Sequence, residues 1–173
     1  MFVDLEGRHV LVVGGGKIAA RRIRTLLEFG CEITVVSPEV GEELREMLEP
    51  DVGTLYAEEE GKSRKVPPGS CRIIWKRKKY EIKEPEAISA DPMETDKFTF
   101  VRAAATPEVN AQVVRECRKK KIPVNNASDR DQCDFYFPGI AKDGDTVIGI
   151  TSGGRDHKLA AKISQAVRNV LHV

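Results

Sequence analysis

Three consecutive glycines near the start of the chain have the spacing of a phosphate-binding turn. The segment HVLVVGGGKIA, residues 9–19, passes from a β-branched apolar run into a helical pattern. Its spacing Gly14-x-Gly16-x-x-Ala19 fits the dinucleotide fingerprint, in which the glycines allow a tight turn and close approach to a pyrophosphate. The first amides of the helix would face the phosphates. The predicted cofactor residues here are Gly14, Gly16, Lys17 and Ile18, and a purely structural turn is the alternative.

The second strand, predicted over residues 32–37, indicates which dinucleotide is bound. An acid at its end reads the ribose 2′-hydroxyl of NAD, and an arginine nearby accommodates the 2′-phosphate of NADP. This chain offers Ser37, Pro38 and Glu39, so the acid is displaced by two positions, and no arginine follows closely. NAD is therefore the predicted cofactor, with these three residues at its ribose.

Strands and helices alternate along most of the 173 residues. This rhythm predicts an α/β fold, a Rossmann-like doubly wound parallel sheet, to which the family resemblance given below adds a small C-terminal dimerisation element. We expect residues 1–137 to form the NAD-binding domain and residues 138–173 a dimerisation and substrate-binding region. The charged stretch 58–70 is expected to be an exposed, mobile insertion. In the last helix, Leu159, Ile163, Ala166, Val167 and Val170 form an apolar stripe that covers either the parent core or a second subunit.

Composition excludes several classes of function. The 28 basic and 27 acidic residues create no global field that favours nucleic acid or a membrane surface. No apolar run approaches the roughly 20 residues that span a bilayer, and no signal segment is visible, so we expect a cytoplasmic protein. Four scattered cysteines and three scattered histidines suggest no metal site.

Polar residues follow the later predicted strands, at the edge where doubly wound sheets bind their ligands. Ala105 ends the strand predicted over residues 98–105 and Thr106 follows it, and both are further cofactor candidates. Asp129 follows the strand predicted over residues 122–126 and could accept a proton, although a turn or cap role is equally consistent with its position in SDRD. Ser128 could orient substrate or water, since an unassisted hydroxyl is a poor base.

Four motifs resemble the precorrin-2 dehydrogenase and sirohydrochlorin ferrochelatase family of siroheme synthesis. They are the glycine turn, AAATPEVN at residues 103–110, VNNASDRDQCDFYFPG at residues 124–139, and ITSGG at residues 150–154. The resemblance covers nearly the whole chain in order. It implies an NAD-binding domain, a small dimerisation region and oxidation of precorrin-2 to sirohydrochlorin, with ferrous iron insertion in some members.

This chain departs from the family pattern at two places that bear on chemistry. The family usually has an aspartate three residues after the asparagine that matches Asn125, whereas here that position is Ser128, followed by Asp129. The family's Gly-Gly-Lys-Ser-Pro becomes Gly153-Gly154-Arg155-Asp156-His157. The catalytic candidates are therefore Asp129 and Ser128, in that order.

The many carboxylates of precorrin-2 would need local positive charge and free amides. The start of the last helix offers both, with a solvated helix start as the alternative. The predicted substrate residues are Asn125, Ser152, Gly153, Gly154, Arg155, His157 and Lys158. A competing hypothesis is a regulatory NAD(H)-sensing module without catalysis, although such a module would usually carry an acid directly after the second strand.

Overall fold

The computed structural model describes residues 3–48, 56–57, 72–81, 98–153 and 155–171 of the chain. These residues belong to two compact units, Met1–Gln132 and Cys133–Val173. The predicted division between residues 137 and 138 stays a prediction. The stretch 58–70, expected to be a mobile insertion, lies outside the described residues. None of the described helices is long and apolar enough to cross a membrane.

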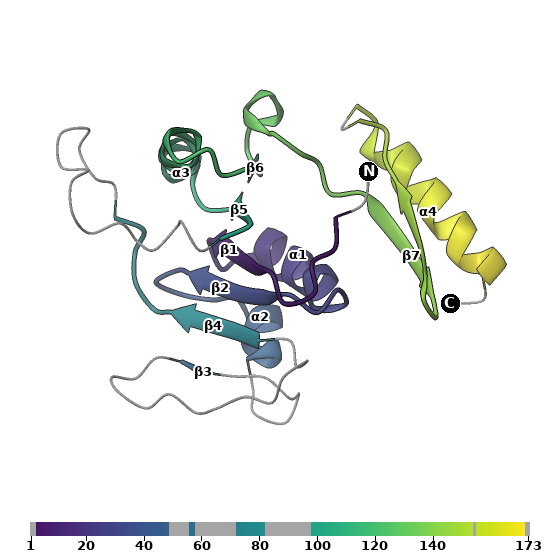
Figure 1. Ribbon diagram of the computed structural model, residues 1–173, viewed down its shortest axis with the longest axis horizontal. Helices are drawn as coiled ribbons and strands as arrows, with labels where there is room; N and C mark the ends of the chain where they lie inside the picture. Colours follow the sequence, from purple (N-terminus) through teal and green to yellow (C-terminus); the bar gives the residue numbers. More distant parts are fainter. Residues whose placement is uncertain (1–2, 49–55, 58–71, 82–97, 154, 172–173) are drawn as a thin grey trace. The chain divides into compact units, whose positions relative to one another are not determined.

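The first unit is built on a parallel sheet of six strands in the order β3-β4-β2-β1-β5-β6 (Figure 1). Because β1 lies between β2 and β5, the order reverses there, and the carboxyl ends of these strands form the edge where such folds bind ligands. This arrangement confirms the predicted doubly wound sheet. The strands are β1 (His9–Val13), β2 (Glu32–Val36), β3 (Tyr56–Ala57), β4 (Arg72–Lys76), β5 (Phe100–Ala103) and β6 (Val124–Asn126).

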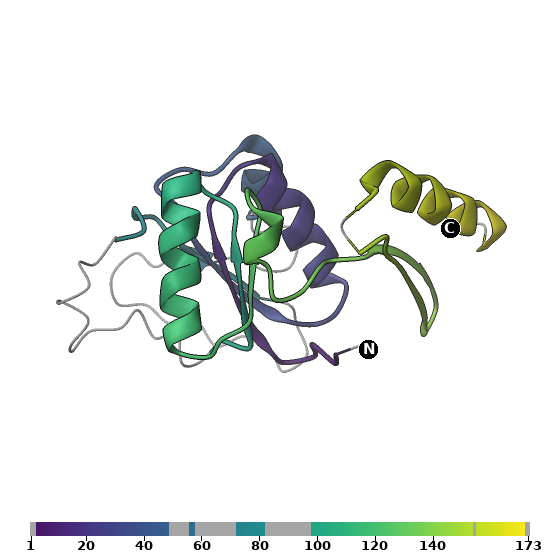
Figure 2. The same cartoon turned by 90° about the horizontal axis from the view of Figure 1, so that it is seen from above.

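Helices cover both faces of this sheet. Figure 2 shows α3 (Pro107–Lys119) on one face and α1 (Lys17–Leu27) on the other. The short helix α2 (Glu42–Met47) follows β2, and a 3-10 turn, η3 (Arg130–Gln132), follows β6. The strands are rich in β-branched residues and buried on both faces, as parallel strands between two helical layers must be.

Alternating residues of the strands form the core beneath α3. Leu11 and Val13 of β1 and Val101 of β5 pack against Val113 and Cys117 of α3, and all five side chains are buried. Burial of one such aliphatic side chain stabilises the fold by about 1.5–3 kcal/mol relative to leaving it exposed. The helix begins after its N-cap residue Thr106, whose hydroxyl accepts from the Val109 amide, and Pro107 occupies its first position.

The second unit is an antiparallel hairpin with one helix. Its elements are β7 (Gly139–Asp143), β8 (Thr146–Ile150) and α4 (His157–Leu171). The sequence predicted the last helix, which is α4, but not β7. The two-residue turn Gly144–Asp145, with positive φ at Gly144, is the local signal that identifies the hairpin. The Arg168 guanidinium ties α4 to β7 by donating to the Ile140 carbonyl at 2.8 Å.

The second unit has almost no core of its own. Among its described residues only Ala141 and Ser164 are buried. Leu159, Ile163 and Val170 of α4 remain 49%, 43% and 77% exposed. The second unit therefore does not bury the apolar stripe by itself, and dimerisation through the stripe stays a prediction.

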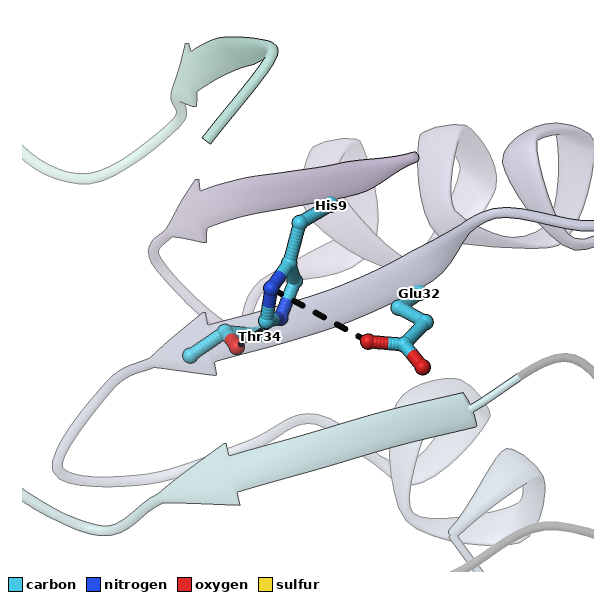
Figure 3. Close-up of polar contacts among 3 residues, drawn as sticks. All are labelled: His9, Glu32 and Thr34. Carbon is cyan, nitrogen blue, oxygen red and sulfur yellow. Dashed lines mark hydrogen bonds and ion pairs between the residues drawn. The ribbon is translucent and has the colours of Figure 1, made fainter. Parts of the chain in front are cut away.

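His9 has a structural environment at the amino-terminal edge of the sheet. Figure 3 shows its ring between Thr34 and Glu32 of the neighbouring strand, with 3.2 Å from Nε2 to Thr34 Oγ1 and 3.9 Å from Nδ1 to Glu32 Oε2. The ring also meets Phe98 edge-on, with centroids 4.8 Å apart. This edge is opposite the carboxyl ends of the strands, so His9 braces the sheet away from the candidate site.

Tyr80 fastens the chain after β4 to α3. Its hydroxyl donates to Glu116, whose other oxygen accepts from Gln112 Nε2 at 2.8 Å. Burial, followed by the hydrogen bond and negative charge of Glu116, raises the pKa of the Tyr80 phenol. The folded state therefore holds the phenol proton more tightly than the unfolded state does.

Replacement of Tyr80 tests this tether. We expect Tyr80→Phe to lower the free energy of unfolding by about 1–3 kcal/mol near neutral pH, because a hydrogen bond to a carboxylate is lost. Above about pH 10 the unfolded phenol ionises whereas the folded one does not, so the wild-type advantage shrinks as pH rises. Urea denaturation at several pH values measures both effects. A stability difference that stays constant up to alkaline pH would contradict this account.

Candidate functional site

Gly14 allows the turn after β1 to lie against the turn after β5. It has φ +113°, and a Cβ at this position would lie 2.3 Å from the Ala104 carbonyl oxygen. The Gly14 amide donates to the Val36 carbonyl at 2.9 Å, and the Ala104 amide donates to the Val13 carbonyl at 2.8 Å. The ends of three neighbouring strands are thereby held together, with no space for any side chain at Gly14.

Gly15, which the fingerprint leaves variable, is also required by close packing. A Cβ there would lie 2.4 Å from the Glu39 carbonyl oxygen. The Gly41 amide donates to the Gly15 carbonyl at 2.8 Å, and the Ser37 hydroxyl donates to the Glu39 carbonyl. The glycine turn and the turn after β2 are therefore interlocked. The sequence signal for this constraint was the run of three glycines, because the dinucleotide fingerprint accounts for only Gly14 and Gly16.

Gly16 differs from the other two glycines because the space beside it is open. No atom lies within 4 Å of the Cβ position, and the residue is exposed. It precedes α1, whose start has no side-chain cap and no acidic residue in its first turn. Lys17 is exposed and Ile18 is 50% exposed at the same place. The first amides of α1 are therefore not capped by a side chain, and a ligand can approach them closely. Such a helix start fits the pyrophosphate of a dinucleotide.

The predicted ribose residues and the further cofactor candidates lie at the same edge of the sheet. Ser37 is buried, whereas Pro38 and Glu39 are exposed after it. Ala105 and Thr106 are exposed after β5. The structure thus brings together the ends of β1, β2 and β5, as predicted for the cofactor side of the site.

A buried asparagine connects two of these turns. Asn110 of α3 accepts from the Ala105 amide at 2.8 Å and donates through Nδ2 to Ser128 Oγ, also at 2.8 Å. The Ser128 hydroxyl in turn donates to Asn126 Oδ1 at 2.9 Å. No role was predicted for Asn110 or Asn126 from the sequence. The available signal was that Asn110 lies one helical turn from Val113 and Val114, on the apolar face of the helix, and a fully buried amide there is an unusual core residue. The Ser128 proton is therefore directed to an amide oxygen.

Asp129 and Asn125, two further candidates, have different surroundings. Asp129 is half-buried, and its Oδ1 accepts from the Asp131 amide at 2.9 Å, so the carboxylate caps η3. Asn125 is buried in β6, where it pairs with Arg102 of β5. Because side chains alternate along a strand and Val124 faces α3, Asn125 lies on the face opposite Asn126.

The remaining substrate candidates belong to the second unit. Ser152 Oγ accepts from the Asp156 amide at 2.9 Å, and Asp156 Oδ1 accepts from the Leu159 amide at 2.8 Å. The Gly153 amide donates to Thr151 Oγ1 at 3.1 Å. Several amides at the start of α4 are thus already used within the unit, whereas Arg155 and Lys158 are exposed. His157 is the first residue of α4, and Gly154 lies outside the described residues.

Across the described part of the chain, no group of three or more His, Cys, Asp or Glu side chains could hold a metal ion. Cys31 and Cys117 are buried, and Cys133 is partly exposed. Among the described residues, the polar groups at this edge include backbone amides, side-chain hydroxyls, the carboxylates of Glu39 and Asp129, and the ammonium group of Lys17.

Comparison with known proteins places this geometry in context. A family model described as "Putative NAD(P)-binding" matches residues 1–139. The "Probable multifunctional siroheme biosynthesis protein HemA" of Ruminiclostridium josui is 33% identical over 98% of this chain and 28% of its own length. A siroheme synthase of Tolumonas auensis is 30% identical over 99% of this chain and 30% of its own length. The chain thus spans less than a third of these two curated relatives.

A solved structure is similar over almost the whole chain. "SirC, precorrin-2 dehydrogenase" has a TM-score of 0.65 and 28% sequence identity, and the match covers 98% of this chain and 69% of that one. The siroheme biosynthesis protein met8 of Schizosaccharomyces pombe is 26% identical over 96% of this chain and 53% of its own length. These likenesses confirm the family resemblance inferred from the motifs, and the Rossmann-like fold.

The two outer glycines of the turn should respond differently to substitution. Gly14→Ala combines a positive φ with a backbone clash, so we expect a loss of at least about 2 kcal/mol in the free energy of unfolding. Gly16→Val meets open space, so we expect a loss of about 1 kcal/mol or less but no NAD binding. Urea denaturation and calorimetry measure the two quantities. Undiminished NAD affinity in Gly16→Val would mean that the dinucleotide binds elsewhere.

Proposed function

Because this chain belongs to the NAD(P)-binding family whose model it matches, we propose that it is an NAD-dependent precorrin-2 dehydrogenase that forms sirohydrochlorin. The observation that carries the proposal is the open, uncapped start of α1 beside Gly16, at the reversal point of a sheet similar to that of SirC. Bound NAD would supply the hydride acceptor, and the chain's residues would hold both reactants and receive a proton.

The three strand ends would divide the dinucleotide between them. The amides after Gly14 and Gly16 would bind the pyrophosphate, with Lys17 adding positive charge and Ile18 an apolar contact. Ser37, Pro38 and Glu39 would contact the adenosine ribose. Ala105 and Thr106 would line the nicotinamide half. Support for this division comes from the hydrogen bonds that hold these turns together at one edge.

Asp129 is the proposed proton acceptor. Oxidation of the macrocycle removes a hydride and a proton, and a carboxylate accepts a proton without assistance near neutral pH. One Asp129 oxygen caps η3, which fixes the orientation of the carboxylate. Ser128 would act differently, because its hydroxyl lies between Asn110 and Asn126 and so holds the turn that carries Asp129.

Substrate carboxylates would be bound by cations rather than mainly by free amides. Arg155 and Lys158 are exposed at the start of α4, where several amides already have partners within the unit. His157, Ser152, Gly153 and Gly154 belong to the same proposed region of the second unit, and Asn125 is a separate proposed substrate residue in the first unit. An exposed arginine can bind a carboxylate through two parallel hydrogen bonds.

A second copy of the chain is the proposed partner of α4. The described part of the second unit buries only Ala141 and Ser164, and two strands with one helix need a larger apolar surface to be stable. Leu159, Ile163 and Val170 provide that surface in a homodimer. The reaction would take place in the cytoplasm, as the sequence predicts.

The proposal is tested by supplying anaerobically prepared precorrin-2 and NAD to the purified chain and following NADH formation. Formation of sirohydrochlorin and NADH in equal amounts supports the proposal. NAD binding without turnover would instead favour the regulatory NAD(H)-sensing module. Iron insertion is assayed on the same protein with sirohydrochlorin and ferrous iron, where iron is a substrate.

Two substitutions separate the roles of adjacent residues. In Asp129→Asn the amide oxygen still caps η3, so we expect intact folding and NAD affinity but a rate lowered about a hundredfold to ten-thousandfold. Ser128→Ala removes a hydrogen-bonded hydroxyl but no base, so we expect it to keep most of its rate. Single-turnover NADH formation measures both. The reverse ranking would transfer the catalytic role to Ser128.

The dimer is tested by placing a charge on the apolar stripe. Ile163→Glu should produce monomers or aggregates in light scattering, because the carboxylate would be buried at the interface. Ala161→Glu is the matched control, since Ala161 is exposed on α4 outside the stripe and its replacement adds the same charge. A wild-type protein that is already monomeric at micromolar concentration would exclude this interface.

A further inference from the structure

The basic run Lys76–Lys79 lies beside the turn that follows β2. β4 pairs with β2 in parallel, with Lys76 opposite Val36, so the run begins where Ser37 begins (Figure 1). The Ser37 amide donates to the Lys76 carbonyl at 3.3 Å. The two segments are therefore neighbours at the edge of the sheet, although they are far apart in the sequence.

Specific side-chain contacts hold Arg77 of this run and the two residues that flank the run, Trp75 and Tyr80. The indole Nε1 of Trp75 donates to the Ser37 carbonyl at 2.9 Å, and the Arg77 guanidinium lies over the Trp75 ring, 5.7 Å from its centroid. A cation above an indole face is attracted by the ring and kept in place. Tyr80, hydrogen-bonded to Glu116, secures the far end of the run.

The charge of the run is exposed and oriented toward solvent at this edge. Arg77, Lys78 and Lys79 are exposed, and neither of the two ion pairs found among the described residues includes them. Glu39 is the nearby acid, two residues after Ser37. The edge next to Ser37 thus offers one acid for a ribose hydroxyl and three cations for an anion.

We propose that Arg77, together with Lys78 and Lys79, binds the 2′-phosphate of a dinucleotide, so that this chain accepts NADP as well as NAD. The inference rests on the proposed cofactor site, because it takes the adenosine ribose to lie at Ser37. A phosphate on that ribose is a dianion, and a guanidinium presents paired donors to it. The sequence offered no arginine soon after β2, and the parallel pairing of β4 with β2 supplies one.

Titration with both dinucleotides tests the inference. Trp75 is the chain's one tryptophan and lies at the proposed phosphate site, so its emission reports binding there. We expect NADP and adenosine 2′,5′-bisphosphate to quench it, with NADP affinity within about tenfold of NAD affinity. Rising salt should weaken NADP binding more than NAD binding, because one more exposed charge pair is screened.

Paired substitutions identify the residues responsible. Arg77→Gln with Lys78→Gln should weaken NADP binding by about tenfold or more, since hydrogen bonds to charged groups are lost, and leave NAD affinity within about twofold. Arg118→Gln with Lys119→Gln is the matched control, removing equal charge from the exposed C-terminal end of α3. Circular dichroism checks that both variants are folded.

The outcomes distinguish this inference from the proposed function. Binding of NAD without NADP, an equal loss of both dinucleotides in the Arg77 variant, or the same loss in the control variant would each overturn the phosphate site alone. Failure of the wild-type chain to bind either dinucleotide would overturn the proposed cofactor site and, with it, this inference.

Discussion

The close approach of the Gly14 turn to the Ala104 carbonyl is the contact on which the rest of the site depends. Two backbone segments, from the ends of β1 and β5, meet where any Cβ would lie 2.3 Å from an oxygen. Gly15 repeats the constraint toward the end of β2. The three strand ends are thus packed closely together. Because α1 directly follows the glycine turn, it begins at the same edge, with its uncapped amides beside Gly16.

Side-chain amides maintain the other half of this edge. Asn110 is fully buried, yet its oxygen and nitrogen both have partners, in Ala105 and Ser128. A buried amide that is fully hydrogen-bonded makes its surroundings rigid, whereas an unsatisfied one would destabilise them. The turns after β5 and β6 are therefore held at a fixed separation. Ser128 takes part in this network, whereas the neighbouring Asp129 caps η3.

The two units differ in how much of their stability they provide themselves. The first has a sheet buried on both faces, with a continuous apolar cluster beneath α3. The second has a hairpin and a helix whose large apolar side chains stay exposed. Apolar area removed from water is the main favourable contribution to folding. The second unit therefore buries little apolar area within itself, which is the physical basis for proposing a homodimer.

Local patterns in the sequence determined the glycine turn, the parallel strands, the cap at Thr106 and the last helix, because backbone preference and hydrophobic period act between near neighbours. The turn Gly144–Asp145 before β8 was equally local, and β7 could have been predicted from it. Only the tertiary structure decided that Gly15 must be a glycine, that Asn110 joins two turns, and that Arg77 lies beside Ser37. Those relations depend on which strands become neighbours in the sheet, and strand order is set by packing among segments far apart in the chain.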